Sequence, residues 1–285
     1  MRGRRIAITG ASGNIGAKLR AALTAAGADL LLIDRVDYGD PAILSADLSL
    51  FPTAGGSSWV ATLAGVDTLV HLAADPRLDA PWARLERDNL DAILNVLEAA
   101  RQQQVRRVVL ASSLHTAIAR VGHDAVIDTV GSSAPVNLYG VSKCAAERLG
   151  AHYARHCDLS VIALRIGWVQ PGENRPGPHL GPLDHQRLWL GNQDCCSGIA
   201  SAIMAPDTLR FGVFNLVSDN AGMPWDLTAT TEALGWRPTQ SSVPVIPTSS
   251  SSRPECWVPN PLRRLPRLLR HWLITHWRSH EDDRD

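Results

Sequence analysis

The sequence predicts an α/β fold in which a doubly wound parallel sheet carries helices on both faces. Short apolar runs recur along the chain and are typical of buried strands, the first at residues 4–9 and another at residues 105–113. Helical periodicity separates them, most clearly over residues 82–103. A glycine-rich turn follows the first strand directly, which is the context in which such sheets bind nucleotides.

The glycine turn carries the first functional prediction. Its spacing is GxxGxxG, preceded by Thr9. The first glycine allows a tight turn, the second lets backbone approach a pyrophosphate, and the third lets helix and strand pack closely. Free N–H groups at the next helix then face the phosphates. A glycine triplet alone is also compatible with a flexible loop. From this stretch we expect cofactor contacts by Gly10, Ser12, Gly13, Asn14, Ile15 and Gly16.

The second strand, residues 30–34, ends in an acid about twenty residues beyond the glycines. The carboxylate of Asp34 can accept hydrogen bonds from an adenosine ribose and would repel a 2′-phosphate. Arg35 beside it has the charge to bind that phosphate, so both dinucleotides remain open, with NAD favoured over NADP. The alternative role for Asp34 is an ordinary turn residue at a strand end.

The remaining strands follow in order, at residues 42–48, 66–74 and 105–113. His71 lies inside the second of these strands, where a packed core histidine is more common than an acid/base group. Two serines end the last strand, at the edge where open parallel sheets bind ligands. One of these serines is therefore a candidate for the catalytic site.

Tyr139 and Lys143 are four residues apart on an expected helix and therefore share one face. A phenol with a pKa near 10 is a poor base at neutral pH. A neighbouring ammonium and a cationic nicotinamide would stabilise the phenolate and bring that pKa closer to the working range. Ser113 can hydrogen-bond the reacting oxygen.

Together these motifs resemble the extended short-chain dehydrogenase/reductase superfamily: TGxxGxxG, the strand-two acid, VxHLAA, ASS and YxxxK, over residues 5–237. The resemblance implies a Rossmann fold, NAD as cofactor and a Ser113–Tyr139–Lys143 triad, with Ser113 rather than Ser112 as its serine. It also implies adenine contacts by Asp47 and Leu48 and support of the lysine by Asn89. The further implied cofactor contacts are Leu72, Ala73, Ala74, Tyr139, Lys143 and Ile166.

Several segments are similar to uronate dehydrogenases, among them ASSLHT, LYGVSKCAAE, LRIG and RLWLGNQDC. That resemblance implies oxidation of a sugar C1 hydroxyl with NAD. The sequence departs from the subfamily at Leu114, where the family has Asn, and at Trp168, where it has Ser. No arginine matches the family's carboxylate-binding residue securely. The implied substrate contacts are Ser113, Leu114, His115, Trp168, Arg175 and Arg187.

We therefore expect an NAD-dependent oxidoreductase acting on a hydroxyl or carbonyl of a small sugar-like or uronate-like molecule. Two alternatives remain open: a sugar epimerase or isomerase that retains its NAD, and a non-catalytic NAD-binding protein. The short stretch between Arg165 and Pro238 disfavours a sugar-nucleotide substrate, because enzymes for those substrates need a larger C-terminal lobe.

Composition limits the partners. The formal net charge is zero, so no overall field attracts nucleic acid or a membrane. Five cysteines without CxxC spacing indicate a reducing cytoplasm, and no metal site is expected. No apolar run reaches membrane-spanning length, and no signal peptide is expected. By analogy with the superfamily we expect a homodimer formed through the helices near residues 85–103 and 139–156.

We expect four segments along the chain. Residues 1–165 form the NAD-binding core with the Tyr-Lys helix, and residues 166–238 form a small substrate-binding region interleaved with it. Residues 239–261 are rich in Ser and Pro and predict a linker. Residues 262–285 predict a basic amphipathic helix in the tail, for which docking on protein is favoured and membrane contact stays open.

Overall fold

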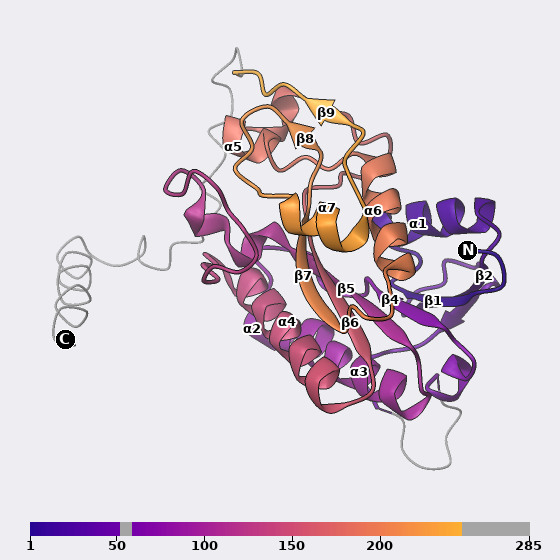
Figure 1. The fold of residues 1–285 in the computed structure, drawn as a ribbon. Coiled ribbons are helices and arrows are strands. Elements are labelled where there is room, and N and C mark those ends of the chain that lie inside the picture. Colours follow the sequence, from indigo (N-terminus) through magenta and orange to yellow (C-terminus); the bar gives the residue numbers. More distant parts are fainter. Residues whose placement is uncertain (52–58, 247–285) are drawn as a thin grey trace, which may run out of the picture. The chain divides into compact units, whose positions relative to one another are not determined.

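Seven parallel strands form the central sheet of the described residues, in the order β3-β2-β1-β4-β5-β6-β7 (Figure 1). The computed structural model describes residues 1–51 and 59–246. The doubly wound parallel sheet predicted from the sequence is confirmed. The strands are β1 (Arg5–Thr9), β2 (Asp29–Asp34), β3 (Ile43–Ser45), β4 (Thr68–His71), β5 (Arg107–Ser113), β6 (Ser160–Ile166) and β7 (Phe211–Leu216).

Helices cover both faces of this sheet (Figure 1). One layer consists of α1 (Asn14–Ala25), α6 (Asn192–Met204) and α7 (Thr228–Leu234). The other consists of α2 (Trp82–Leu85), α3 (Ala92–Gln102) and α4 (Leu138–His156). The short α5 (Leu183–Gln186) and a parallel pair, β8 (Asp219–Asn220) and β9 (Ser241–Ser242), lie outside the main sheet.

Alternation along the strands builds two apolar cores. In β1, Ile6 and Ile8 pack with α1 and α6, whereas Ala7 packs with α3. The same alternation recurs in β5, where Val109 faces the α1 layer and Val108 faces the α3 layer. Because successive side chains of a strand point to opposite faces, a strand buried on both sides must be apolar throughout. The continuous apolar runs of the sequence have this cause.

Strand order reverses beside β1, because β2 lies on one side of it and β4 on the other. Such a switch point opens a crevice at the carboxyl ends of the strands, where ligands bind. Thr9 at the end of β1 pairs in register with Ile33 of β2 and His71 of β4. The turns that follow these three strands therefore begin side by side.

The helix expected over residues 82–103 is interrupted. A π-helical segment, Glu86–Asp91, joins α2 to α3. Two consecutive polar residues of this segment, Asp88 and Asn89, are buried. Two polar side chains thus enter the interior next to the crevice.

The predicted linker at residues 239–261 differs from the structure at its start. Asp194 at the beginning of α6 is fully buried and accepts hydrogen bonds from Thr239 and Gln240. The Gln240 side chain in turn accepts from the N–H groups of Gln193 and Asp194. These contacts attach the start of the Ser/Pro-rich stretch to α6.

Two predictions lie outside the described residues. They are the rest of the linker, residues 247–261, and the tail helix at residues 262–285.

Within residues 1–51 and 59–246, no helix has the length and hydropathy that crossing a bilayer requires.

Replacing Asp194 tests this anchor. Asp194→Ala leaves four donors without their acceptor, those of Ser218 Oγ, Thr239 N, Thr239 Oγ1 and Gln240 N. We expect a loss of about 2–4 kcal/mol in the free energy of unfolding, measured by urea denaturation. Asp207→Ala is the matched control, because that aspartate side chain is 82% exposed and its change should cost below about 1 kcal/mol. Equal losses in both variants would contradict the anchor.

Candidate active site

The glycine turn after β1 approaches the end of β4 closely. Gly10 has a φ of +70°, and a Cβ atom on it would lie 2.7 Å from the backbone nitrogen of Ala73. A Cβ on Gly16 would collide with the carbonyl oxygen of Gly10. Both positions therefore require glycine, as the fingerprint predicts.

Helix α1 begins with its first amide groups open. Gly13 is the N-cap, and no side chain among the described residues caps this terminus. The first N–H groups of any helix lack partners within the helix, and together with the helix dipole they favour an anion. The close-packed glycines and the uncapped terminus fit the diphosphate of a dinucleotide.

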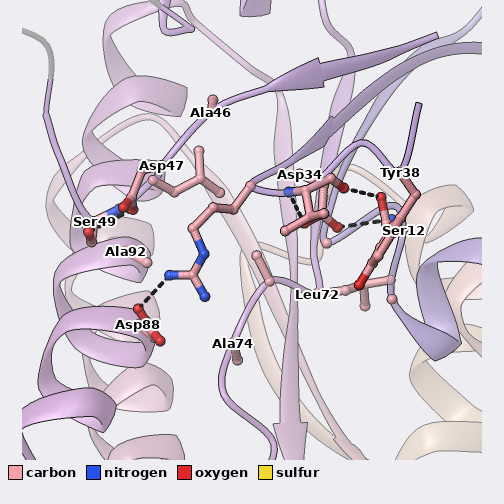
Figure 2. Close-up of a pocket in the computed structure, with 16 residues that line it drawn as sticks. Ser12, Asp34, Tyr38, Ala46, Asp47, Ser49, Leu72, Ala74, Asp88 and Ala92 are labelled. Carbon is pink, nitrogen blue, oxygen red and sulfur yellow. Dashed lines mark hydrogen bonds and ion pairs between the residues drawn. The ribbon is translucent and has the colours of Figure 1, made fainter. Parts of the chain in front are cut away.

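A pocket of about 230 Å³ opens at the switch point (Figure 2). Its lining includes nine residues that were expected to contact the cofactor: Gly10, Ser12, Gly13, Asp34, Asp47, Leu48, Leu72, Ala73 and Ala74. The other lining residues are Arg35, Val36, Tyr38, Ala46, Ser49, Asp88 and Ala92. Sequence reasoning missed Asp88 and Ala92, although their spacing of four on one helical stretch was a usable signal.

Asp34 is held by backbone amides of the glycine turn and of the loop that follows it. One carboxylate oxygen accepts from the Ser12 N–H at 2.9 Å and the other from the Val36 N–H at 3.2 Å (Figure 2). The two bonds hold the acid at the pocket wall, where a ribose diol is expected to meet it. The ribose hydroxyls would add to bonds that already orient this carboxylate.

Seven other predicted cofactor residues are not among those lining this pocket. Two of them, Tyr139 and Lys143, belong to the triad described below, and the remaining five have other surroundings. Asn14 donates to the Val169 carbonyl at 2.8 Å, and Ile15 packs against the core of the α1 layer. Gly16 lies buried in α1, and Ile166 lies buried at the end of β6. The fifth is Asn89.

Asn89 ties two parts of the site together. Its side chain accepts from the Asp75 N–H at 2.7 Å and donates to Ser142 Oγ at 3.0 Å. Ser142 Oγ in turn donates to the Tyr139 carbonyl at 2.7 Å. The resemblance implied that this asparagine supports the lysine. In the structure its side chain joins the loop after β4 to the helix that carries Tyr139 and Lys143.

The predicted triad is brought together. Lys143 Nζ lies 5.6 Å from the centre of the Tyr139 ring and donates to the Ala111 carbonyl at 2.8 Å. Ser113 at the end of β5 hydrogen-bonds the Tyr139 phenol. Ser113 Oγ also accepts from the His115 N–H at 3.2 Å, which leaves its proton free for the phenol.

Burial dominates the protonation of this triad. It raises the pKa of Tyr139 to about 12, although the hydrogen bond from Ser113 opposes the rise. It also lowers the pKa of Lys143 to about 8. The lowered tyrosine pKa expected from the sequence is therefore not a property of the protein alone, because desolvation disfavours both the phenolate and the ammonium.

The second serine of the strand end has another role. Ser112 Oγ donates to Glu147 at 2.5 Å, and Glu147 forms a buried two-bond ion pair with Arg165 at 2.9 Å. Ser112 is thus committed to a structural charge pair. This arrangement supports Ser113 as the catalytic serine.

His71 is fully committed to the core. It is buried in β4, and its Nδ1 lies 2.8 Å from Thr9 Oγ1. Burial lowers its pKa to about 3, and the Lys143 charge adds to the effect. A histidine kept neutral and hydrogen-bonded in this way is a packing residue.

Two of the predicted substrate residues lie beside Tyr139. The rings of His115 and Tyr139 meet edge to face, 6.1 Å between centres. Burial lowers the pKa of His115 to about 4, and His185 contributes to the shift. His185 in turn meets the ring of Trp168 at 6.4 Å. His185 is a residue that sequence reasoning missed, because only the fold brings α5 against the end of β5.

The other predicted substrate residues have different surroundings. Leu114 is 1% exposed and packs among Ile127, Leu188, Val217 and Trp225. Arg175 is 78% exposed in its side chain and pairs with Glu173 at 2.5 Å. Arg187 pairs with Asp184 at 2.9 Å. Leu114 is therefore a core residue, and both arginines already have acidic partners on their own loops.

Comparison with known proteins places this site in a family. Residues 6–178 match the model of the NAD dependent epimerase/dehydratase family. The chain is similar to L-arabinose 1-dehydrogenase (NAD(P)(+)) of Haloferax volcanii, with 32% identity over 85% of this chain and 99% of that protein. It is also similar to the NAD-dependent glucose-6-phosphate dehydrogenase of the same organism, with 29% identity over 83% of this chain and 94% of that protein.

Among solved structures, the chain is similar to a mutant uronate dehydrogenase from Agrobacterium tumefaciens complexed with NAD. The identity is 28%, the TM-score is 0.69, and the match covers 84% of this chain and 85% of that one. The resemblance inferred from the motifs is confirmed, and the chain belongs to the NAD dependent epimerase/dehydratase family.

Proposed function

We propose that this protein is an NAD-dependent dehydrogenase that interconverts a hydroxyl and a carbonyl on a small sugar-like or uronate-like substrate, with Tyr139 as general acid/base. The single observation that carries this proposal is the triad, in which Ser113 contacts the phenol and Lys143 lies 5.6 Å from the ring. The triad follows β5, and the nucleotide pocket lies at the ends of β1, β2 and β4 on the same edge of the sheet.

Each residue of the triad has a definite task in this proposal. Tyr139 takes the proton of the substrate hydroxyl during oxidation and returns it during reduction. Ser113 orients that hydroxyl, and Lys143, held by the Ala111 carbonyl, supplies positive charge beside the phenol. NAD, when bound, supplies the ring that accepts hydride. A positive ring next to the phenol would oppose the pKa rise that burial causes.

Substrate size follows from the length of chain outside the core. The match spans 99% of the Haloferax L-arabinose enzyme, so the two chains have similar room for a substrate. The names of these relatives refer to a pentose, a hexose phosphate and uronates. His115 lies beside Tyr139, and the rings of His185 and Trp168 meet each other, so this part of the chain offers aromatic and imidazole groups to such a substrate. These features support a small sugar-like substrate and leave the individual sugar open.

The epimerase alternative has less support. Five relatives that match over 78–85% of this chain are dehydrogenases by name, whereas a relative named as a UDP-glucose epimerase matches over 56% of it. A non-catalytic role is also less supported, because the Tyr139–Lys143 pair and its serine are intact and correctly placed.

Two further proposals concern the state of the protein. We propose a homodimer that buries α3 and α4, because Leu94 and Val141 are 44% and 40% exposed on these helices. We also propose a reducing, cytoplasmic setting, since the described cysteines Cys144, Cys157, Cys195 and Cys196 are all free thiols.

Turnover and the tyrosine are tested together. Purified protein is given NAD and a panel of pentoses, hexoses, hexose phosphates, uronates and secondary alcohols, and reduced cofactor is followed by absorbance. On any active substrate, Tyr139→Phe should lower kcat by about 10²–10⁴-fold while the Kd for NAD changes by less than about twofold. Full turnover by Tyr139→Phe would refute the mechanism. Product formation without net reduction of NAD would favour the epimerase alternative.

The buried lysine gives a prediction on stability. Unfolded lysine titrates near 10.5 and folded Lys143 near 8, so between these values only the unfolded chain holds the proton and stability rises with pH. Lys143→Met removes the charge. We expect this variant to exceed the parent protein by about 2 kcal/mol in unfolding free energy at pH 7, with the gap narrowing towards pH 10. Urea denaturation at both pH values measures it, and an unchanged gap would contradict the burial of a charged lysine.

The dimer is tested by charge on its proposed surface. Leu94→Glu should convert the dimer into a monomer in sedimentation analysis, because a carboxylate would be buried in the dimer interface without a partner. Leu50→Glu, at a leucine 67% exposed outside these helices, should leave the mass unchanged. A parent protein that already sediments at single mass would refute the dimer.

A further inference from the structure

We propose that Asp88 decides between the two nicotinamide dinucleotides by holding the Arg35 guanidinium away from the place that a ribose 2′-phosphate would take. Asp88 is then a positioning residue, because it acts through Arg35 and not on the reacting atoms. The inference rests on the dinucleotide site proposed above and assigns the selectivity of that site to a pair of residues from different elements.

Arg35 has two possible partners at the pocket. It follows Asp34 directly, and both residues line the same cavity. In the structure Arg35 Nη1 donates to Asp88 Oδ1 at 3.0 Å. Figure 2 places Asp34 and Asp88 on different sides of the pocket, with the ion pair drawn as the dashed line at Asp88. The guanidinium is therefore engaged on the side of the π-helical segment and not on the side of Asp34.

Asp88 is well suited to hold this charge. Its side chain is 7% exposed. Besides Arg35, the carboxylate forms ion pairs with Arg87, at an N–O distance of 2.8 Å, and with Arg84, at 3.4 Å. Burial would raise the pKa of Asp88, but the hydrogen bonds from Arg87 and Arg35 outweigh burial and keep it below its usual range. The carboxylate thus stays ionised at neutral pH. Asp88 is buried next to Asn89 in the π-helical segment.

With Arg35 bound to Asp88, the charged group left at the expected ribose position is the Asp34 carboxylate. Asp34 is oriented by the Ser12 and Val36 amides and lies where the ribose 2′ position is expected. A 2′-phosphate there would meet the Asp34 carboxylate without a compensating guanidinium, because Arg35 is bound to Asp88. If the charge of Asp88 is removed, Arg35 loses its acidic partner and a phosphate dianion becomes the nearest strong acceptor. The same flexible side chain would then favour the phosphorylated cofactor.

Binding measurements test this directly. The Kd values for NAD and NADP are measured by calorimetry on the full chain, without substrate, for the parent protein, Asp88→Asn and Asp91→Asn. In Asp88→Asn the ratio of the NADP Kd to the NAD Kd should fall by about tenfold, which is the effect of one charge-assisted contact to phosphate. Asp91→Asn removes the same charge from an exposed position of the same π-helical segment and should leave the ratio unchanged.

The double variant Asp88→Asn/Arg35→Ala separates the role of Arg35 from a general change in charge. It should return the ratio to that of the parent protein. A ratio that stays low in the double variant, or one that does not move in Asp88→Asn, would overturn the inference. A parent protein that binds neither dinucleotide would instead refute the proposed function, so the two failures are distinguishable.

Arg35→Ala alone keeps the inference testable if Asp88→Asn does not fold. The Arg35 side chain is 47% exposed, and we expect it to make no contact with a 2′-phosphate in the parent protein. The ratio should therefore change by less than about twofold. A tenfold loss of NADP affinity with NAD unchanged would show that Arg35 already reaches the phosphate and would overturn the role of Asp88.

Discussion

The contact between the glycine turn and the end of β4 is the constraint on which the site depends. A Cβ on Gly10 would lie 2.7 Å from the Ala73 backbone, so only glycine lets the two turns meet. Their meeting at the switch point places Gly10 and Gly13 in the same pocket lining as Leu72 and Ala73. A wider separation would leave the expected diphosphate site and the backbone after β4 on unconnected surfaces. Close backbone packing therefore precedes every contact that side chains make with a cofactor.

A second set of contacts connects this pocket to the catalytic helix. Asn89 bonds the Asp75 backbone and Ser142, and Ser142 bonds the Tyr139 carbonyl. The two side chains that form these bonds, Asn89 and Ser142, are buried, so the bonds are made at low dielectric and are costly to break. The loop after β4 and the start of α4 are thus held as one unit, which fixes where the phenol stands relative to the expected cofactor. Buried hydrogen bonds achieve here what a flexible loop could not, because a misplaced acid/base group loses much of its effect.

The sequence predicted the sheet, its switch point and the chemistry at strand ends, because these depend on local apolar runs and on residue types adjacent to them. It did not predict the partner of Arg35, since Asp88 is 53 residues away and only the fold brings the two side chains together. His185 was missed for the same reason. The linker prediction at residue 239 was wrong at its start, because Ser/Pro composition does not reveal that Asp194 is buried and accepts the backbone there. Local patterns give elements, and long-range polar pairs need the fold.

The site also concentrates charges that a core would normally exclude. Lys143 and Tyr139 are buried where desolvation opposes the charged form of each, and this cost is present whether or not substrate is bound. Nothing in the fold alone benefits from it, since an apolar residue at position 143 would pack without such a penalty. The cost is explained if the low dielectric strengthens the attraction between phenolate and ammonium when the proton leaves. At neutral pH the resting protein holds an ammonium beside a neutral phenol, and loss of the phenol proton turns the two groups into an ion pair whose attraction is strongest where water is excluded.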